Sequence, residues 1–507
     1  MAEPRFTRLG LFLLLVAVGA VAICSIIYEL LIGSISAYFI GDSVEQFSLT
    51  IGFFLFAMGL GSWLSRWIEE QLLARLIALE LWLGLVGGVS VAVLYLAFAQ
   101  GTHYRYWMLL LTTIIGSLIG LELPLLTRLL QNYGSLRTTL ANVLSLDYLG
   151  ALVAALLFPY LLLPALGNLH TGLLTGLVNA LVGTGLLWNC WDQLTPSWRR
   201  GLALQAAVVL TGLLGLLASA GALLERWESD LYTDRVIYSQ QTRYQKIVLT
   251  RWREDLRLYL DGHLQFASGD ERRYHESLVH PAMTLARSHQ RVLIIGGGDG
   301  LTAREVLKYP DAEEVDLVDL DPAMTNLARR NLDLTRLNEN ALNYPQVRVL
   351  NQDAFTFLQE AQVQYGVILI DLTDPRTEAV TKLYSVEGYQ LCRRLLSPGG
   401  VLVTQATSPY HARHAFWCIG KSLEEAGFRV YPYHVLVPSF GEWGFQLASM
   451  ELLAPDKVQF SVPLRFLRSE LLHGMFLFDP DMERVQVEAN RLDRPVLARY
   501  YRDEWGE

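Results

Sequence analysis

Long apolar runs separated by short polar segments fill the first 224 residues of the chain, and the pattern stops after Glu225. A helical run of about 20 residues, rising about 1.5 Å per residue, is long enough to cross the ~30 Å hydrocarbon core of a bilayer. We therefore expect a transmembrane domain at residues 1–227 with about seven helices. The expected spans are 9–37, 46–65, 76–99, 106–127, 140–164, 169–190 and 202–224.

Residues 228–290 change to short stretches in which apolar and polar positions alternate, such as "RVIYSQ" and "LRLYLDG". Such alternation is typical of β-hairpins with one solvated face, so a small β-rich lid subdomain is expected here. Across residues 291–507, buried-strand runs such as "RVLIIGGG" alternate with amphipathic helical stretches, which predicts a doubly wound, Rossmann-like, mostly parallel sheet. The predicted fold class is a multi-pass α-helical membrane domain followed by an α/β domain.

Composition agrees with this division, because 52% of the residues are hydrophobic and only 18% are charged. The first apolar run is too long for the core of a cleaved signal peptide, so we expect it to be a retained helix. The formal net charge of −9 argues against a nucleic-acid partner, since phosphates require a basic surface. The four cysteines form no CxxC pair, so neither a metal site nor a disulfide framework is expected.

Arginines gather in alternate loops of the apolar half, which bears on membrane sidedness. Basic residues in short loops mark the cytoplasmic side, so the N-terminus is expected inside. After seven crossings, everything beyond Leu224 would lie outside. Arg105 is the exception to the bias. The arginines that carry it are Arg5, Arg8, Arg66, Arg75, Arg128, Arg137, Arg199 and Arg200.

Four acids interrupt the apolar runs: Glu29, Glu80, Glu122 and Asp147. Ionisable groups at bilayer depth are costly and often functional, so they suggest a cation pathway. The alternative is that each acid lies near a helix end or is neutral and hydrogen-bonded to a neighbouring helix. Both interpretations stay open on the sequence.

Acidic residues also recur where the predicted strands of the α/β half end. In open α/β sheets, ligands bind at the carboxyl ends of the strands, so these side chains are expected to meet around one ligand. The acids at these positions are Asp299, Asp319, Asp353 and Asp371, with Asp374 close behind.

The glycines Gly296, Gly297 and Gly298 follow the first strand of this half. Glycines in such a turn let the backbone approach a nucleotide-like ligand closely. An acid about 20 residues further on is placed to accept hydrogen bonds from ribose hydroxyls. Asp319 and Asp321 both satisfy that spacing.

The remaining acids indicate the charge of the ligand's other end. Asp299, Asp371 and Asp374 would repel a pyrophosphate, which makes NAD and ATP poor candidates, and would attract ammonium groups. A sulfonium nucleoside such as S-adenosylmethionine fits this charge pattern. Its own carboxylate would be disfavoured by Asp299, whereas the decarboxylated form offers only an amine there.

Several motifs resemble the polyamine aminopropyltransferases, the spermidine synthase family, in the right order over about residues 232–455. The seven-span N-terminal half and the ending "EANRLDRPVLARYYRDEW" resemble the membrane-anchored bacterial branch. The matching motifs are "LYLDGHLQFASGDERRYHESLVHPAM", "VLIIGGGDGLTAREVLKYP", "VDLDPAM", "QDAFTFL", "VILIDLTDP", "LYSVEGYQLCRRLLSPGGVLVTQATSPY" and "VPSFGEWGFQLAS".

The resemblance implies residues for the nucleoside co-substrate, decarboxylated S-adenosylmethionine; no permanently bound cofactor is implied. Gln245 matches a residue that touches the nucleoside, and Asp319 the acid that binds the ribose. Asp353 with Ala354 corresponds to an Asp-Gly pair beside the adenine. Asp299 matches the acid that holds the aminopropyl or polyamine nitrogen.

For the diamine, the resemblance implies Asp371 as the proton acceptor, with Tyr274 beside it. His275 matches a residue at the amine-binding end, and Gln265 lies in the adjoining lid strand. Asp374 matches a second amine ligand. The implied reaction transfers the aminopropyl group to a diamine such as putrescine and gives spermidine and methylthioadenosine.

Three departures from the family pattern affect the adenine and acceptor ends. Leu372 stands where soluble relatives have a serine, Ala354 replaces a glycine, and the Gly-Pro-Ala stretch near the adenine is absent. Two alternative functions stay open. One is an S-adenosylmethionine-dependent methyltransferase, and the other is a polyamine transporter or sensor whose α/β half only binds.

The resemblance also bears on location and assembly. The nucleoside co-substrate is expected in the cytoplasm, which favours a cytoplasmic catalytic domain on the inner membrane, against the arginine bias. The expected partners are the two small-molecule substrates and the lipid bilayer. Soluble relatives form dimers or tetramers, which suggests a homo-oligomer.

Overall fold

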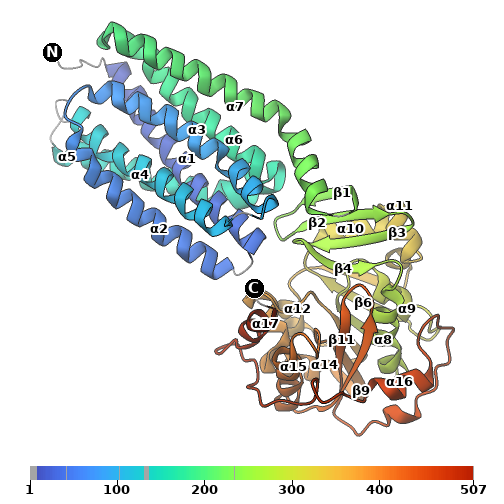
Figure 1. Ribbon diagram of the computed structural model, residues 1–507. Coiled ribbons are helices and arrows are strands. Elements are labelled where there is room, and N and C mark those ends of the chain that lie inside the picture. Colours follow the sequence, from blue (N-terminus) through green and yellow to red (C-terminus); the bar gives the residue numbers. More distant parts are fainter. Residues whose placement is uncertain (1–7, 41–42, 102, 131–135, 233, 506–507) are drawn as a thin grey trace. The chain divides into compact units, whose positions relative to one another are not determined.

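The computed structural model describes residues 8–40, 43–101, 103–130, 136–232 and 234–505. The chain divides into two compact units, Met1–Thr233 and Asp234–Glu507, which are described separately below. The first unit is helical and the second combines two sheets with helices (Figure 1).

Long apolar helices make up the first unit. Within the described part of this unit, six helical segments are long and apolar enough to cross a membrane, and one of them, Leu140–Asn189, has 50 residues. That segment contains two helices, which a π-helical turn at Phe158–Leu162 separates. The second helix also has a kink near its start, at Gly167, whose backbone is non-helical (φ 69°, ψ 175°). Each expected span therefore corresponds to one helix. The helices are α1 (Arg8–Ile40), α2 (Ser43–Leu64), α3 (Leu72–Ala99), α4 (Tyr104–Leu130), α5 (Leu136–Leu157), α6 (Leu163–Asn189) and α7 (Pro196–Leu231).

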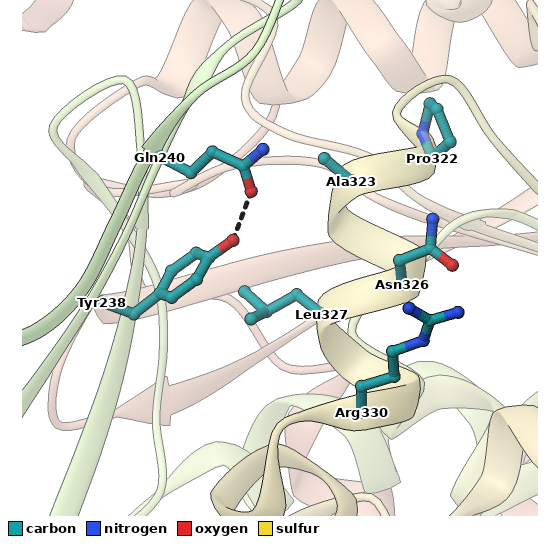
Figure 2. Close-up of a pocket in the computed structure, with 7 residues that line it drawn as sticks. All are labelled: Tyr238, Gln240, Pro322, Ala323, Asn326, Leu327 and Arg330. Atoms are coloured by element: carbon teal, nitrogen blue, oxygen red, sulfur yellow. Dashed lines mark hydrogen bonds between the residues drawn. The ribbon is translucent and has the colours of Figure 1, made fainter.

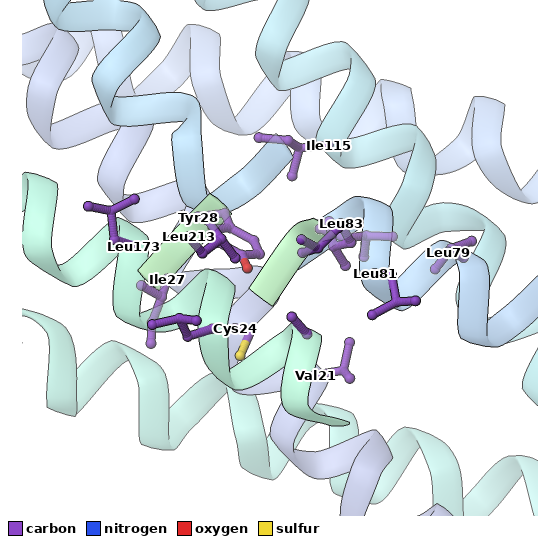
Figure 3. Close-up of a cluster of buried hydrophobic side chains, with 14 of the residues drawn as sticks. Val21, Cys24, Ile27, Tyr28, Leu79, Leu81, Leu83, Ile115, Leu173 and Leu213 are labelled. Atoms are coloured by element: carbon purple, nitrogen blue, oxygen red, sulfur yellow. The ribbon is translucent and has the colours of Figure 1, made fainter. Parts of the chain in front are cut away.

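The interior of the helical unit is packed with aliphatic side chains around α1, α3 and α6. Figure 3 shows Ile27 and Tyr28 of α1 among Leu83 of α3 and Leu173 of α6, all of them buried. Helices α3 and α6 approach closely where glycines face each other. A Cβ on Gly176 would lie 2.5 Å from the carbonyl oxygen of Gly84. Small residues at such crossings are typical of helices that pack within a membrane.

One of the acids in this unit has a defined hydrogen-bond partner. Glu80 is 2% exposed, and its Oε2 accepts a hydrogen bond of 3.0 Å from Nδ2 of Asn179 on α6. This hydrogen bond joins α3 to α6. For Glu80 it matches the alternative in which a buried acid is hydrogen-bonded to a neighbouring helix.

The second unit begins with a four-stranded antiparallel sheet of order β1-β2-β3-β4. Burial alternates along β1 and β3, as the sequence pattern predicts, whereas β2 is buried over four consecutive residues. The strands are β1 (Arg235–Gln241), β2 (Lys246–Trp252), β3 (Asp255–Leu260) and β4 (His263–Ala267).

A seven-stranded sheet of order β10-β11-β9-β8-β5-β6-β7 forms the centre of this unit. Strands β5 to β9 are parallel, and β11 and β10 add antiparallel at one edge. This confirms the Rossmann-like fold class. The strands are β5 (Arg291–Gly296), β6 (Glu314–Asp319), β7 (Val347–Asn351), β8 (Tyr365–Asp371), β9 (Leu396–Gln405), β10 (Arg429–Val437) and β11 (Gly441–Ser449).

The strand order reverses between β5 and β8. From β5 the chain builds outward through β6 and β7, then returns to β8 on the other side of β5. Such a reversal leaves a crevice at the carboxyl ends of the two strands, where ligands bind in doubly wound folds. Gly296 at the end of β5 pairs with Asp371 at the end of β8, so both predicted site residues lie at this point.

Helices cover the seven-stranded sheet, and two of them bear on the site. Helix α8 packs against β8, β9 and β10, and the C-terminal helix α17 packs against α15. The helices of four or more residues are α8 (Glu271–Leu285), α9 (Leu301–Val306), α10 (Pro322–Arg330), α11 (Leu332–Leu337), α12 (Ala354–Glu360), α13 (Glu378–Thr381), α14 (Val386–Leu395), α15 (Arg413–Glu425), α16 (Ser469–Met475) and α17 (Leu497–Trp505).

The glycine contact between α3 and α6 can be tested with a matched pair of substitutions. Gly176→Ala places a methyl group against the backbone of α3, so we expect it to destabilise the helical unit by about 1–3 kcal/mol. Gly185, on the same helix, has open space around its Cβ position, so Gly185→Ala should leave stability unchanged or raise it. Thermal unfolding of the full chain in detergent measures both; equal melting temperatures would contradict the close approach.

Candidate active site at the ends of β5 and β8

The glycine turn after β5 lies against the backbone of Asp371. Gly296 and Gly297 both have positive φ values, of 83° and 64°. A Cβ on Gly296 would lie 2.1 Å from the carbonyl oxygen of Asp371, and the amide of Gly297 donates to that oxygen at 2.9 Å. Only glycine combines this backbone conformation with this approach. The turn therefore fixes where β8 ends and where the Asp371 side chain begins.

Two hydroxyl groups hold the Asp371 carboxylate. The phenol of Tyr274, on α8, donates to Oδ1 at 2.8 Å, and Thr302, on α9, donates to Oδ2 at 2.5 Å. Burial, followed by the nearby charge of Asp371, raises the pKa of Tyr274 well above its ordinary value, which keeps the phenol protonated as a donor. Each carboxylate oxygen keeps further lone pairs with which to accept a hydrogen bond from a ligand.

Asp299 lies in the glycine turn, close to His275. Its Oδ1 accepts a hydrogen bond of 2.8 Å from the amide of Leu301 at the start of α9. Burial raises the pKa of Asp299 to about 6, with the charge of Asp371 adding to the rise and His275 opposing it. The two carboxyl groups and the imidazole thus form one electrostatic group.

The surroundings of His275 favour the protonated form of its imidazole. Burial alone lowers the pKa of His275, but the hydrogen bond and charge of Glu271, followed by the charges of Asp299 and Asp371, raise it to about 9. Nδ1 of His275 lies 3.0 Å from Oε2 of Glu271. Arg304, 2% exposed, holds both oxygens of Glu271 at 2.8 and 2.9 Å, so the imidazole is fixed from behind by a buried ion pair.

The predicted ribose end is built around Asp319 and Asp321. Burial raises the pKa of Asp319 to about 7, and a Cβ on Gly298 would lie 2.5 Å from its Oδ2. Asp321 caps α10 and accepts hydrogen bonds from Thr242 at 2.9 Å and from Gln245 at 3.1 Å. Of the two acids that the sequence left open, Asp319 therefore faces the glycine turn, while Asp321 ties the small sheet to α10.

At the predicted adenine end, Asp353 has hydrogen-bond and ion-pair partners that the sequence does not indicate. Asp353 caps α12 by accepting from Thr356 at 3.0 Å and forms a 2.7 Å ion pair with Lys382. Burial raises the pKa of Asp353, but the hydrogen bonds from Lys382 and Thr356, together with the Lys382 charge, lower it overall. Ala354 is buried in the first turn of α12.

Of the two remaining predicted residues, Asp374 lies beside the acids and Gln265 has no recorded contact with them. Asp374 follows β8 and accepts a hydrogen bond of 2.7 Å at Oδ2 from Tyr501 of α17. Its charge acts on the phenol of Tyr274, which places it beside the Asp371 group. Gln265, on β4, donates to the carbonyl of His263 in its own strand at 3.1 Å, a contact that does not join it to the acids.

The acids do not line the cavity shown in Figure 2. That cavity lies between β1 and α10, and its lining includes Tyr238, Gln240, Asn326 and Arg330. Its lining contains none of the predicted site residues. The candidate active site is therefore defined by the carboxylates at the strand ends rather than by this cavity.

Sequence reasoning missed several residues that touch the predicted site. Thr302 is in the first turn after the glycine turn, a position that itself indicates proximity to a ligand. Glu271 stands four residues before His275, the spacing of neighbours on one helix face. Lys382 and Tyr501 give no local signal, because only the fold brings them to Asp353 and Asp374.

The raised pKa of His275 predicts a pH-dependent contribution to stability. A folded pKa of about 9 exceeds the ordinary value of about 6.5, so the stabilisation is fully present below pH 6.5 and is lost as the pH rises through 9. The melting temperature of wild type should exceed that of His275→Gln by several degrees at pH 6, and by less at pH 10. His473→Gln, at an exposed position on α16, serves as control. A gap that grows with pH would contradict the assignment.

Comparison with known proteins identifies the family. Residues 271–459 match the model of the spermine/spermidine synthase domain. Polyamine aminopropyltransferase 1 of Ralstonia nicotianae is 46% identical, and the aligned region covers 99% of this chain and 97% of that protein. The polyamine aminopropyltransferase of Leptospira interrogans is 44% identical over 97% of this chain and 98% of its own length.

Among solved structures, a spermidine synthase in complex with the transition state analogue AdoDATO is 26% identical. It covers 54% of this chain and 88% of its own, with a TM-score of 0.46. The relatives that match over nearly the whole length include the helical half as well as the α/β half. The chain therefore belongs to the spermine/spermidine synthase family, as a polyamine aminopropyltransferase.

Proposed function

We propose that this enzyme transfers the aminopropyl group of decarboxylated S-adenosylmethionine to a diamine such as putrescine, giving spermidine and methylthioadenosine. The observation that carries the proposal is the Asp371 carboxylate, held by Tyr274 and Thr302 at the strand-order reversal, with Asp299 beside it. Family membership favours aminopropyl transfer over methyl transfer and over binding without turnover.

The charges of the site support a ligand with two cationic ends. The charges of Asp371 and Asp374 act on Tyr274, and those of Asp299 and Asp371 act on His275. The carboxylates therefore outnumber the one imidazole among the residues predicted for the amine end. An amine on the nucleoside can donate hydrogen bonds to Asp299. A carboxylate at the same place would be repelled, which favours the decarboxylated co-substrate.

In the proposed reaction the amine nitrogen attacks the methylene carbon next to the sulfonium. A C–N bond forms and the C–S bond breaks, with its electron pair staying on sulfur in methylthioadenosine. The sulfonium is already a good leaving group, so the enzyme mainly aligns the two reactants. The attacking nitrogen must lose a proton, and Asp371 accepts it. Tyr274 and Thr302 hold that carboxylate in a single orientation.

At the nucleoside end we propose that Asp319 accepts hydrogen bonds from the ribose hydroxyls and that Gln245 contacts the nucleoside. Asp353 and Ala354 would border the adenine. An ion pair with Lys382 fixes the Asp353 carboxylate beside the proposed adenine position. Lys382 lies on the segment after Asp374, where the family's Gly-Pro-Ala stretch is absent.

We further propose that the helical unit anchors the enzyme in the inner membrane, with the catalytic unit in the cytoplasm. The length and apolar character of the helices support the anchor. Supply of the nucleoside co-substrate supports the cytoplasmic side. Seven crossings would then place the arginine-bearing loops outside, against the usual bias, so the side is a direct experimental question.

Replacing the proposed proton acceptor tests the reaction. Asp371→Asn keeps the size of the side chain but removes the base, so we expect methylthioadenosine release to fall by about 10²–10⁴-fold. The assay uses the full chain in detergent with putrescine and decarboxylated S-adenosylmethionine. Asp311→Asn, with a side chain 64% exposed, should retain wild-type activity. Wild-type turnover by Asp371→Asn, or no release by wild type with any diamine, would refute the proposal.

Reporter fusions test the location. A fluorescent protein joined after Tyr232, where the helical unit ends, should fluoresce if the catalytic unit is cytoplasmic. Alkaline phosphatase joined at the same place should be inactive, because it matures only outside the cytoplasm. Active phosphatase with a dark fluorescent fusion would instead place the catalytic unit outside, as the arginine bias predicts.

A further inference from the structure

The C-terminal segment docks on the part of the chain that follows Asp374. Asn490 donates to the carbonyl of Thr381 at 2.8 Å and accepts from the amide of Val386 at 2.9 Å. Its Oδ1 accepts from the amide of Leu497, the first residue of α17, at 3.3 Å. Asn490 and Leu497 lie beyond the matched family domain, which ends at 459. The C-terminal extension, residues 460–505, thus lies outside the matched domain and packs against the loop of the candidate active site.

Tyr501 makes the contact that matters for the site. It is fully buried, and its hydroxyl donates to Oδ2 of Asp374 at 2.7 Å. The guanidinium of Arg376 lies 5.2 Å from the centre of the Tyr501 ring, so the ring also contacts the loop that carries Asp374. A buried hydroxyl on a packed helix restricts the rotation of the carboxylate that it contacts.

The same loop is held from the sheet side. Gln405, at the end of β9, donates to the carbonyl of Thr373 at 3.3 Å and to the hydroxyl of Tyr384 at 2.5 Å. Tyr384 in turn donates to the same carbonyl at 3.3 Å. The backbone before Asp374 is thus fixed by the core, and the C-terminal helix adds a hydrogen bond to the Asp374 carboxylate itself.

We infer that Tyr501 is a positioning residue that sets how the enzyme holds the far ammonium group of its diamine. The inference rests on the proposed function, in which Asp371 takes the attacking nitrogen and Asp374 the other. Two carboxylates fixed at a set separation favour a diamine whose nitrogens match it. The C-terminal extension therefore contributes to the choice of acceptor without contacting the reacting atoms.

Tyr501→Phe removes only the hydroxyl and tests this role. Losing one hydrogen bond to a carboxylate should raise KM for putrescine about tenfold, while kcat and KM for decarboxylated S-adenosylmethionine stay within about twofold. The preference for putrescine over the longer cadaverine should narrow. Tyr500→Phe is the matched control, since the hydroxyl of Tyr500 accepts a long hydrogen bond of 3.5 Å from the amide of Glu488.

A double-mutant comparison separates positioning from general packing. If Tyr501 acts through Asp374, adding Tyr501→Phe to Asp374→Asn should change KM for putrescine no further. An unchanged KM in Tyr501→Phe, or an equal loss for both substrates with a lowered melting temperature, would overturn the inference while leaving the proposed function intact. A wild-type enzyme that releases no methylthioadenosine would overturn both.

Discussion

The site depends on the meeting of two strand ends, where the backbone of Gly296 and Gly297 lies against the carbonyl of Asp371. This contact needs positive φ angles and the absence of a side chain, and it fixes the end of β8. Two hydroxyls then orient the Asp371 carboxylate. The proposed reaction requires little beyond alignment and removal of a proton, and a carboxylate held in one orientation suits the proposed role of proton acceptor.

Charge is arranged in layers around this contact. Asp299 and Asp371 act on His275, whose pKa is raised to about 9, chiefly by Glu271 against the effect of burial. Behind it, Arg304 neutralises Glu271 in a fully buried pair. Buried charges without partners are costly, so the pair of Arg304 and Glu271 allows His275 and the acids beside it to be buried. The result is a site that attracts cations while remaining stable.

The two units of the chain are stabilised by different kinds of contact. In the helical unit, glycines let α3 and α6 approach closely, and Glu80 is hydrogen-bonded to Asn179. In the α/β unit, long-range contacts converge on the loop after β8, including Tyr501 from the far C-terminus. The proposed anchor and the proposed selection of the acceptor thus arise from segments on either side of the matched family domain.

The sequence by itself determined the helical half, the alternation of strands with helices and the glycine turn, because apolar periodicity and glycine constraints act locally. It also determined that acids stand at the strand ends, since the position of a residue after a buried run is readable from the chain. Only the tertiary structure decided which donor holds each acid: Thr302 for Asp371, Lys382 for Asp353 and Tyr501 for Asp374. Two of these partners are 29 and 127 residues from their acids. No local pattern encodes such pairings, because they form only when separate elements pack against one another.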